Sequence, residues 1–298
     1  MAILNVDCQL NVLLLICDVL SEVGPTPKKE LVTLCVSGVE NDPNKRTLGS
    51  INQFNNIGEG VGLFDEDTNQ TISFAKEYQE IDKCPPQERL EKLPKLLRRA
   101  IFSNQLKDDF MTSNEGSNDI NRAFAWLLSQ DVYTMSLANN PMFELEREQF
   151  KKTRERVLDD NSSRTRNMRE WGTFLGFIDQ SSNDAIIDPT RAIQETLPDV
   201  FGRKKELKAE EFIKRLAEEL PPLDGGKFRN AVEKCLDTKS WNKPEDGVLS
   251  KSLSRALWRL HKNPKTQFQM EPRADAGSWG LDLPQGANPR SFSHVRGS

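Results

Sequence analysis

The sequence predicts a mainly α-helical protein with small β-hairpins, organised as tandem winged helix-turn-helix units joined by a helical segment. Two observations lead to this fold class. Short amphipathic helices followed by a pair of short apolar strands recur along the chain, and this is the element order of a winged helix. The inner faces of the first two copies also share their spacing, since Met168 falls on Ile51 when Trp171 is placed on Phe54.

The first unit is predicted to span residues 1–80. Apolar residues at helical spacing from Gln9 to Val23 predict its first helix, which ends at Gly24-Pro25. Thr26 is expected to cap a second helix, with Pro27 at the first helical position. A third helix that ends near Ile57 and a hairpin with strands at 61–64 and 71–74 complete the unit.

Residues 81–145 predict a helical linker segment, in which Leu90, Leu93 and Leu97 lie on one amphipathic face. The second winged-helix-like unit is predicted at 146–200. Its elements are a charged helix at 146–158, a turn, a helix through Leu175, and a hairpin formed by 176–179 and 185–187.

The third winged-helix unit is predicted at 201–298. Helices are expected at 209–220, 226–236 and 249–261, and a wing is expected from strands at 266–270 and 278–283. The last of these helices opens a basic segment, because there are five basic and no acidic residues between Lys251 and Phe268.

Basic side chains on the outer face of a third helix are typical of a helix that enters the DNA major groove. Arginine there reads guanine, and lysine fixes the register on phosphate. An ordinary solvated helix face is the alternative interpretation. The residues predicted to contact DNA are Arg164, Arg166 and Arg169 in the second unit and Lys251, Arg255, Arg259 and Lys262 in the third.

The first unit has the opposite charge. Its first 80 residues include 5 basic and 12 acidic residues, and three acids in a row, Asp65 to Asp67, lie at the tip of the predicted wing. These carboxylates would repel phosphate at close range. A protein partner is therefore expected for this unit.

The chain offers no constellation of catalytic residues, and we expect it not to be an enzyme. Its two histidines, His261 and His294, lie far from any cysteine, and no phosphate-binding loop motif is present. The five cysteines form no C-x-x-C pair, which indicates reduced thiols. The acidic clusters are interpreted as solvated loops, so neither a metal nor another cofactor is expected.

The longest apolar run, Val12–Cys17, is far shorter than a membrane span. The first residues also lack the pattern of a signal peptide. We therefore expect a cytoplasmic protein with no membrane partner.

Met1–Val6, the leucine-rich helix that follows, Gly24-Pro25 and Glu30–Cys35 resemble the start of a bacterial winged-helix family found in DNA-modification and restriction clusters. This family is DpdG, a component of systems that insert 7-deazaguanine into DNA. The resemblance covers about the first 75 residues. It implies a non-catalytic restriction or phage-defence component that works with helicase or nuclease subunits.

Together, these features predict a DNA-binding adaptor within a DNA-modification, restriction or phage-defence complex, with double-stranded DNA and other protein subunits as partners. Two alternatives remain open. A homodimeric winged-helix transcriptional regulator would bind a specific operator tightly, whereas an adaptor would bind weakly and with strong salt dependence. A protein-only scaffold would be unaffected by neutralising the basic helix of the third unit.

Overall fold

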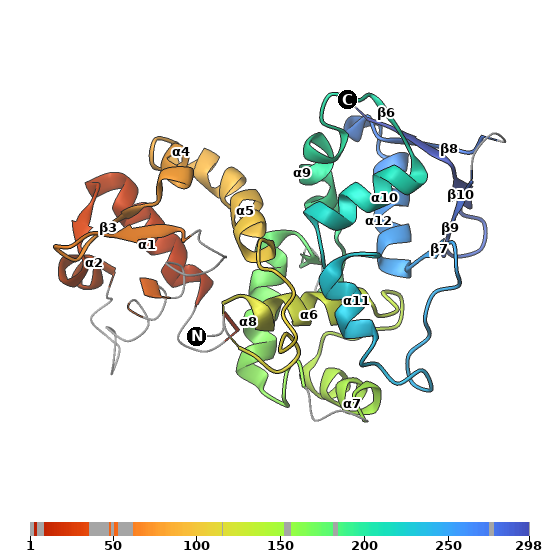
Figure 1. Cartoon of the computed structure of the whole chain (residues 1–298), viewed down its shortest axis with the longest axis horizontal. Coiled ribbons are helices and arrows are strands. Elements are labelled where there is room, and N and C mark those ends of the chain that lie inside the picture. Colours follow the sequence, from red (N-terminus) through yellow and green to blue (C-terminus); the bar gives the residue numbers. More distant parts are fainter. Residues whose placement is uncertain are drawn as a thin grey trace. The chain divides into compact units, whose positions relative to one another are not determined.

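The computed structural model describes residues 3–4, 9–35, 48, 51–52, 62–114, 116–151, 156–180, 184–273 and 277–297 (Figure 1). These residues fold mainly into α-helices with several small β-sheets, which confirms the predicted fold class at this level. Two compact units make up the chain. Unit 1 contains Met1–Ile120 and Asn161–Trp171, and unit 2 contains Asn121–Asp160 and Gly172–Ser298. Helices α6 (Asn118–Leu128) and α8 (Ser162–Leu175) contribute residues to both units.

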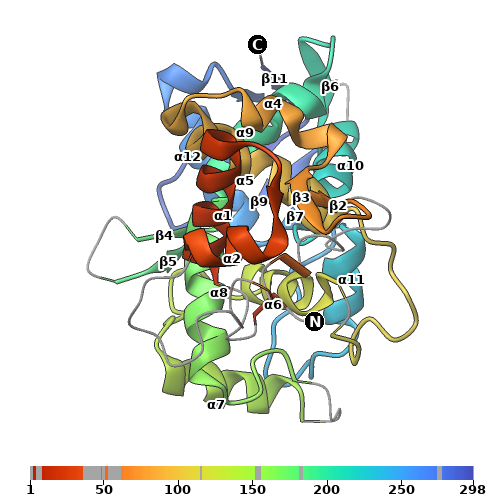
Figure 2. The ribbon, with the colours of Figure 1, turned by 90° about the vertical axis from the view of Figure 1, so that its left-hand side faces the viewer.

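Unit 1 begins with the helix that the apolar pattern predicted. This helix, α1, ends at Gly24, whose φ of 83° lies in the region that favours glycine. Its contacts with α2 and those of α2 with strand β3 can be followed in Figure 2. The described elements are α1 (Leu10–Val23), β1 (Thr26–Pro27), α2 (Lys28–Cys35), β2 (Phe64–Glu66), β3 (Thr71–Phe74), the 3-10 helix η1 (Lys76–Tyr78), α4 (Gln79–Asp82) and α5 (Pro86–Phe102).

The strands of unit 1 form an antiparallel sheet in the order β1-β3-β2. The hairpin β2–β3 confirms that two paired strands lie here, with the second at its predicted bounds; the first includes Asp65 and Glu66, which were predicted to lie in the turn. The prediction for Thr26 and Pro27 was wrong, because these residues form strand β1 instead of starting a helix. The Thr26 hydroxyl donates to the Gly24 carbonyl at 2.7 Å and does not cap α2. Most of the predicted third helix of this unit lies outside the described residues.

A buried carboxylate ties the start of the chain into unit 1. Asp119, at the beginning of α6, is completely buried and accepts hydrogen bonds from the N–H groups of Ile3 at 3.1 Å and Leu4 at 2.7 Å. The side-chain amide of Asn167, on α8, donates to the Leu4 carbonyl at 3.1 Å. Buried backbone groups need such partners, so this cluster fixes the first described residues to two helices of the unit.

Unit 2 contains the other described elements. The helices predicted for the third unit are present as α10, α11 and α12, and the hairpin predicted within 176–187 is present as β4–β5. The elements are α7 (Asn139–Gln149), β4 (Ile178–Asp179), β5 (Ile186–Ile187), α9 (Thr190–Phe201), β6 (Glu206–Lys208), α10 (Ala209–Glu219), α11 (Lys227–Glu233), β7 (Val248–Leu249), α12 (Lys251–Lys262), the 3-10 helix η2 (Pro264–Thr266), β8 (Gln269–Glu271), β9 (Trp279–Leu281), β10 (Ser291–Phe292) and β11 (His294–Arg296).

Two three-stranded sheets lie in unit 2, one in the order β6-β11-β8 and one in the order β10-β9-β7. The predicted wing, with strands at 266–270 and 278–283, was wrong in its pairing. Strand β8 pairs with β11, whereas β9 pairs with β10 and β7. The physical reason is the last strand of the chain: β11 lies between β6 and β8, and its Val295 is completely buried.

The predicted helix at 146–158 was also wrong in its bounds, because residues 150, 151 and 156–158 are described and are not helical. Helix α7 begins earlier, at Asn139, and ends at Gln149. Three backbone N–H groups of the following turn, at residues 157–159, donate to the buried Glu146 carboxylate. Asp159 and Asp160 have positive φ angles of 56° and 52°, which fit the turn predicted after this helix.

A network of charged side chains covers the sheet β6-β11-β8. The Glu206 carboxylate accepts hydrogen bonds from Arg273 at 2.9 and 2.7 Å and from Arg296 at 2.8 Å. These two guanidinium groups hold the pKa of Glu206 at about 2. Because this value is depressed, the stabilising contribution of Glu206 is present above the ordinary glutamate pKa of ~4.3 and is lost as the pH falls toward 2.

We therefore expect Glu206→Gln to lower the free energy of unfolding near neutral pH. The difference from wild type should shrink as the pH falls below about 4. Urea denaturation followed by tryptophan fluorescence at several pH values measures both effects. Glu219→Gln, at an exposed position of α10, is the control and should show little difference at any pH. A Glu206→Gln difference that is independent of pH would contradict the expectation.

Candidate functional site

Helix α12 presents its basic residues on one face. Ser250 caps the helix by accepting a hydrogen bond from the Leu253 N–H. The opposite face, which includes Leu253, Leu257 and Leu260, is buried. Side chains three or four positions apart share a helix face, so all the cations predicted for the third unit lie together. We call this set the cationic face; its members are Lys251, Arg255, Arg259 and Lys262.

Two members of the cationic face are ion-paired. Lys251 donates to the Asp131 carboxylate, and this hydrogen bond raises the pKa of Lys251. Arg259 pairs with Asp188, whose side chain is only 4% exposed, whereas that of Arg259 is 41% exposed. A DNA phosphate at either position would therefore compete with a carboxylate that is already in place.

The other two members are differently placed. The guanidinium carbon of Arg255 lies 5.9 Å from the centre of the Tyr133 ring, a cation–π geometry, and Tyr133 is 44% exposed. Lys262, in the last turn of the helix, is exposed. These two cations are therefore the members of the cationic face that an anionic partner could meet without displacing a carboxylate.

The three arginines predicted in the second unit lie on α8, in the part of that helix that belongs to unit 1. Arg166 is exposed, with its Nε 3.9 Å from Glu170. Arg164 is half-buried, and its Nε and Nη2 atoms are buried without a hydrogen-bond partner among the described residues. Arg169 is half-buried as well. The structure therefore presents them as a separate set, with one exposed and two half-buried members.

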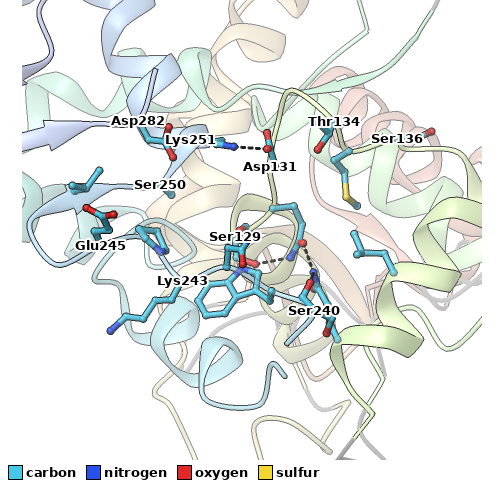
Figure 3. Close-up of a pocket in the computed structure, with 18 of the residues that line it drawn as sticks. Ser129, Asp131, Thr134, Ser136, Ser240, Lys243, Glu245, Ser250, Lys251 and Asp282 are labelled. Atoms are coloured by element: carbon cyan, nitrogen blue, oxygen red, sulfur yellow. Dashed lines mark hydrogen bonds and ion pairs between the residues drawn. The ribbon is translucent and has the colours of Figure 1, made fainter. Parts of the chain in front are cut away.

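A pocket of about 870 Å³ opens in unit 2 beside the first turn of α12 (Figure 3). Its walls come from the end of α6, the turn before α7, α7 itself, the loop at 240–245, strand β7, the start of α12 and the end of β9. Lys251 belongs both to this wall and to the cationic face, and Figure 3 shows its ion pair with Asp131 in the wall. The pocket and the cationic face are therefore continuous at Lys251.

The pocket wall mixes neutral polar, charged and apolar residues. Eight lining residues are neutral and polar: Ser129, Gln130, Thr134, Ser136, Gln149, Ser240, Asn242 and Ser250. Five are charged: Asp131, Lys243, Glu245, Lys251 and Asp282. The apolar side chains include Met135, Leu145 and Trp241. Such a wall suits a ligand that has both hydrogen-bonding edges and an apolar surface.

Buried hydrogen bonds hold one wall of the pocket in place. Gln149 accepts from the Trp126 indole N–H and donates to the Gln130 side chain, both at 2.7 Å. The Trp241 indole N–H donates to the Ser129 carbonyl at 3.0 Å. A fully satisfied buried network of this kind rigidifies its surroundings, so the pocket is preformed on this side.

Sequence reasoning found the cationic face but missed the pocket. Residues 129–131, 240–245 and 281–282 come from distant parts of the chain. The ion pair between Lys251 and Asp131 joins residues 120 positions apart. No motif or periodicity connects such residues, and none of the pocket-lining residues except Lys251 was among the predicted site residues.

Both histidines and the two buried cysteines take structural positions. His261 accepts the Met270 N–H through Nδ1 at 3.1 Å, and burial lowers the pKa of its imidazole. His294 is buried beside Ser293. Burial raises the pKa of the Cys17 and Cys35 thiols, the latter to about 11. These thiols are therefore poor nucleophiles at neutral pH.

Within the described ranges, no group of three or more histidine, cysteine, aspartate or glutamate side chains is arranged to hold a metal ion. The same ranges contain no helix with both the length and the apolar character needed to cross a membrane.

Comparison with known proteins identifies one family. The model of the DpdG-like family matches residues 1–276, which is most of the chain. Comparisons with curated proteins and with solved structures give no significant match. The match extends the resemblance seen at the start of the sequence through both units. The chain therefore belongs to the DpdG-like family, and this membership indicates a component of the Dpd 7-deazaguanine DNA-modification system.

Proposed function

We propose that this protein is a non-catalytic adaptor of the Dpd system that contacts duplex DNA through the cationic face of α12. The observation that carries the proposal is the placement of Lys251, Arg255, Arg259 and Lys262 on one side of a helix whose other side is buried. A helix anchored in this way can present cations to DNA without reorganising, which limits the entropic cost of binding. Phosphate contacts by such cations supply most of non-specific DNA affinity.

The strand order supports a winged-helix arrangement around α12. In a winged helix, the first strand follows helix one, the other two strands follow helix three, and the last strand lies in the middle of the sheet. Helices α9, α10 and α12 and the sheet β6-β11-β8 follow this order, with α11 as an additional helix. Helix α12 then occupies the position of the helix that reads the major groove. The order β1-β3-β2 in unit 1 supports the same arrangement there.

Unit 1 is proposed to bind a protein subunit of the same system. Residues 1–80 carry a net charge of −7, from 5 basic and 12 acidic residues. On α1 and α2, Leu15, Val23 and Leu34 are 40%, 59% and 47% exposed. Exposed apolar side chains with acidic surroundings favour contact with a protein over contact with phosphate.

The DNA contact can be tested with a fluorescently labelled duplex and an anisotropy titration over a range of salt concentrations. We expect the double variant Arg255→Glu/Lys262→Glu to lose about 100-fold or more in affinity at low salt, because two attractive contacts become repulsive. The slope of log affinity against log salt should fall by about 2, since each phosphate contact contributes about 0.9. Within the described residues neither side chain is part of an ion pair, so the substitutions break no salt bridge of the fold.

Lys234→Glu/Lys239→Glu is the matched control, since it makes the same change of net charge at exposed positions of unit 2 outside α12. It should bind nearly as wild type does. Equal losses in the two double variants would mean that net charge, and not the cationic face, governs binding. Absence of binding by wild type at low salt would refute the DNA contact and favour the protein-only scaffold.

A further inference from the structure

The pocket beside α12 has the chemistry of a site for an uncharged polar ring. Its volume of about 870 Å³ is well above what a single base needs and lies within the usual range of small-molecule sites. Asn242 is exposed at the wall, and its side-chain amide makes no hydrogen bond to the described residues. Amide side chains of this type read the edges of nucleobases through paired donor and acceptor groups. Met135, Leu145 and Trp241 supply apolar surface for the face of a ring.

The charges argue against a phosphate inside the pocket. The wall contains three carboxylates, Asp131, Glu245 and Asp282, and only two ammonium groups. One of these ammonium groups, that of Lys251, is already bound to Asp131. An anion would therefore be repelled from the interior, whereas outside it would find Arg255, Arg259 and Lys262 along the cationic face. This division suits a nucleotide whose base is inside and whose phosphates are outside.

We propose that the pocket receives one unstacked nucleobase of a DNA strand whose phosphates lie along the cationic face of α12. The inference rests on the proposed DNA contact and adds that the protein binds a single nucleobase of that DNA. Extruding a base costs a few kcal/mol, and least where the base pair is already weak. Hydrogen bonds to Asn242 and contact with the apolar side chains offset that cost. Thr134, exposed at the wall, marks a position where a larger side chain would narrow the pocket.

The test uses a short duplex that carries 2-aminopurine opposite a mismatched base and a fluorescent label at one end. Anisotropy of the label reports DNA binding, and 2-aminopurine emission reports whether the base leaves the stack. With wild type we expect a rise in both signals. With Thr134→Trp we expect the anisotropy rise to persist and the emission rise to be reduced, because the indole narrows the pocket while the cationic face is intact. Asn242→Leu should reduce the emission rise without filling the pocket.

Thr33→Trp is the control, since it places the same side chain at an exposed position of α2 that contributes nothing to the pocket. It should behave as wild type does. An emission rise in Thr134→Trp equal to that of wild type would overturn the assignment of the base to this pocket. Binding by wild type with no emission rise would also overturn it, and would leave the pocket to a peptide segment of a protein subunit. If wild type gives no anisotropy change with this duplex or with its single strand, both the DNA contact and the base site are refuted.

Discussion

A chain that ends at Arg290 is expected to lose the folded structure of unit 2. The deletion removes β10 and β11, and β11 is the middle strand of the sheet β6-β11-β8. Phe292 and Val295, both completely buried, are lost with them. Burial of such side chains contributes about 1.5–3 kcal/mol each. Strands β6 and β8 also lose their hydrogen-bond partner, and β9 loses one of its two. The sum is comparable with the whole stability of an ordinary domain, which is about 5–15 kcal/mol.

Far-ultraviolet circular dichroism, thermal melting and limited proteolysis would show this loss. In the full-length chain, Val295→Asp should act in the same direction, whereas Arg296→Ala, at an exposed position of the same strand, should have a much smaller effect. Cooperative melting of the shortened chain at the wild-type temperature would show that β11 is dispensable. Because the family match ends at residue 276, a fragment cut at that boundary should fail in the same way.

Local patterns predicted the helices well, because an apolar face at helical spacing is a property of neighbouring residues. α1, α5, α10 and α12 all lie where such a face predicted them. Strand pairing in unit 2 could not be predicted in this way. Strands β6 and β11 are short, and their paired residues Glu206 and Arg296 are 90 positions apart. A strand of three residues has too little periodicity to be recognised, and its partner is chosen by tertiary packing.

The candidate site could likewise be predicted only in part. The cationic face could be predicted, since its members repeat every three or four residues on one helix. Its carboxylate partners could not, because Asp131 and Asp188 precede Lys251 and Arg259 by 120 and 71 positions. The pocket could not be predicted for the same reason, because its lining residues are also far apart in the sequence. A basic helix read from sequence alone therefore overstates the charge that is free to meet phosphate.

Glu146→Ala is expected to destabilise unit 2 by about 3–5 kcal/mol, because three buried or partly buried N–H groups lose their acceptor. The Glu146 carboxylate is completely buried and accepts from Val157, from Leu158 at 2.6 Å and from Asp159 at 3.2 Å. Through these bonds the carboxylate fixes the turn at residues 157–159, which follows α7. The free energy of unfolding from urea denaturation measures the effect, and Glu144→Ala, at an exposed position of α7, is the control.

Glu146→Gln separates the hydrogen bonds from the charge. Its amide oxygen can keep the two N–H groups that Oε1 now accepts, so the loss near neutral pH should be far smaller than for Glu146→Ala. Burial raises the pKa of Glu146 above its ordinary value. The stability that follows from this shift is present below the ordinary pKa and is lost as the pH rises through the raised one. Wild type should therefore gain stability relative to Glu146→Gln as the solution becomes acidic, opposite to the trend for Glu206→Gln. If alanine and glutamine were equally harmful, the buried charge itself, and not the acceptor geometry, would hold the turn.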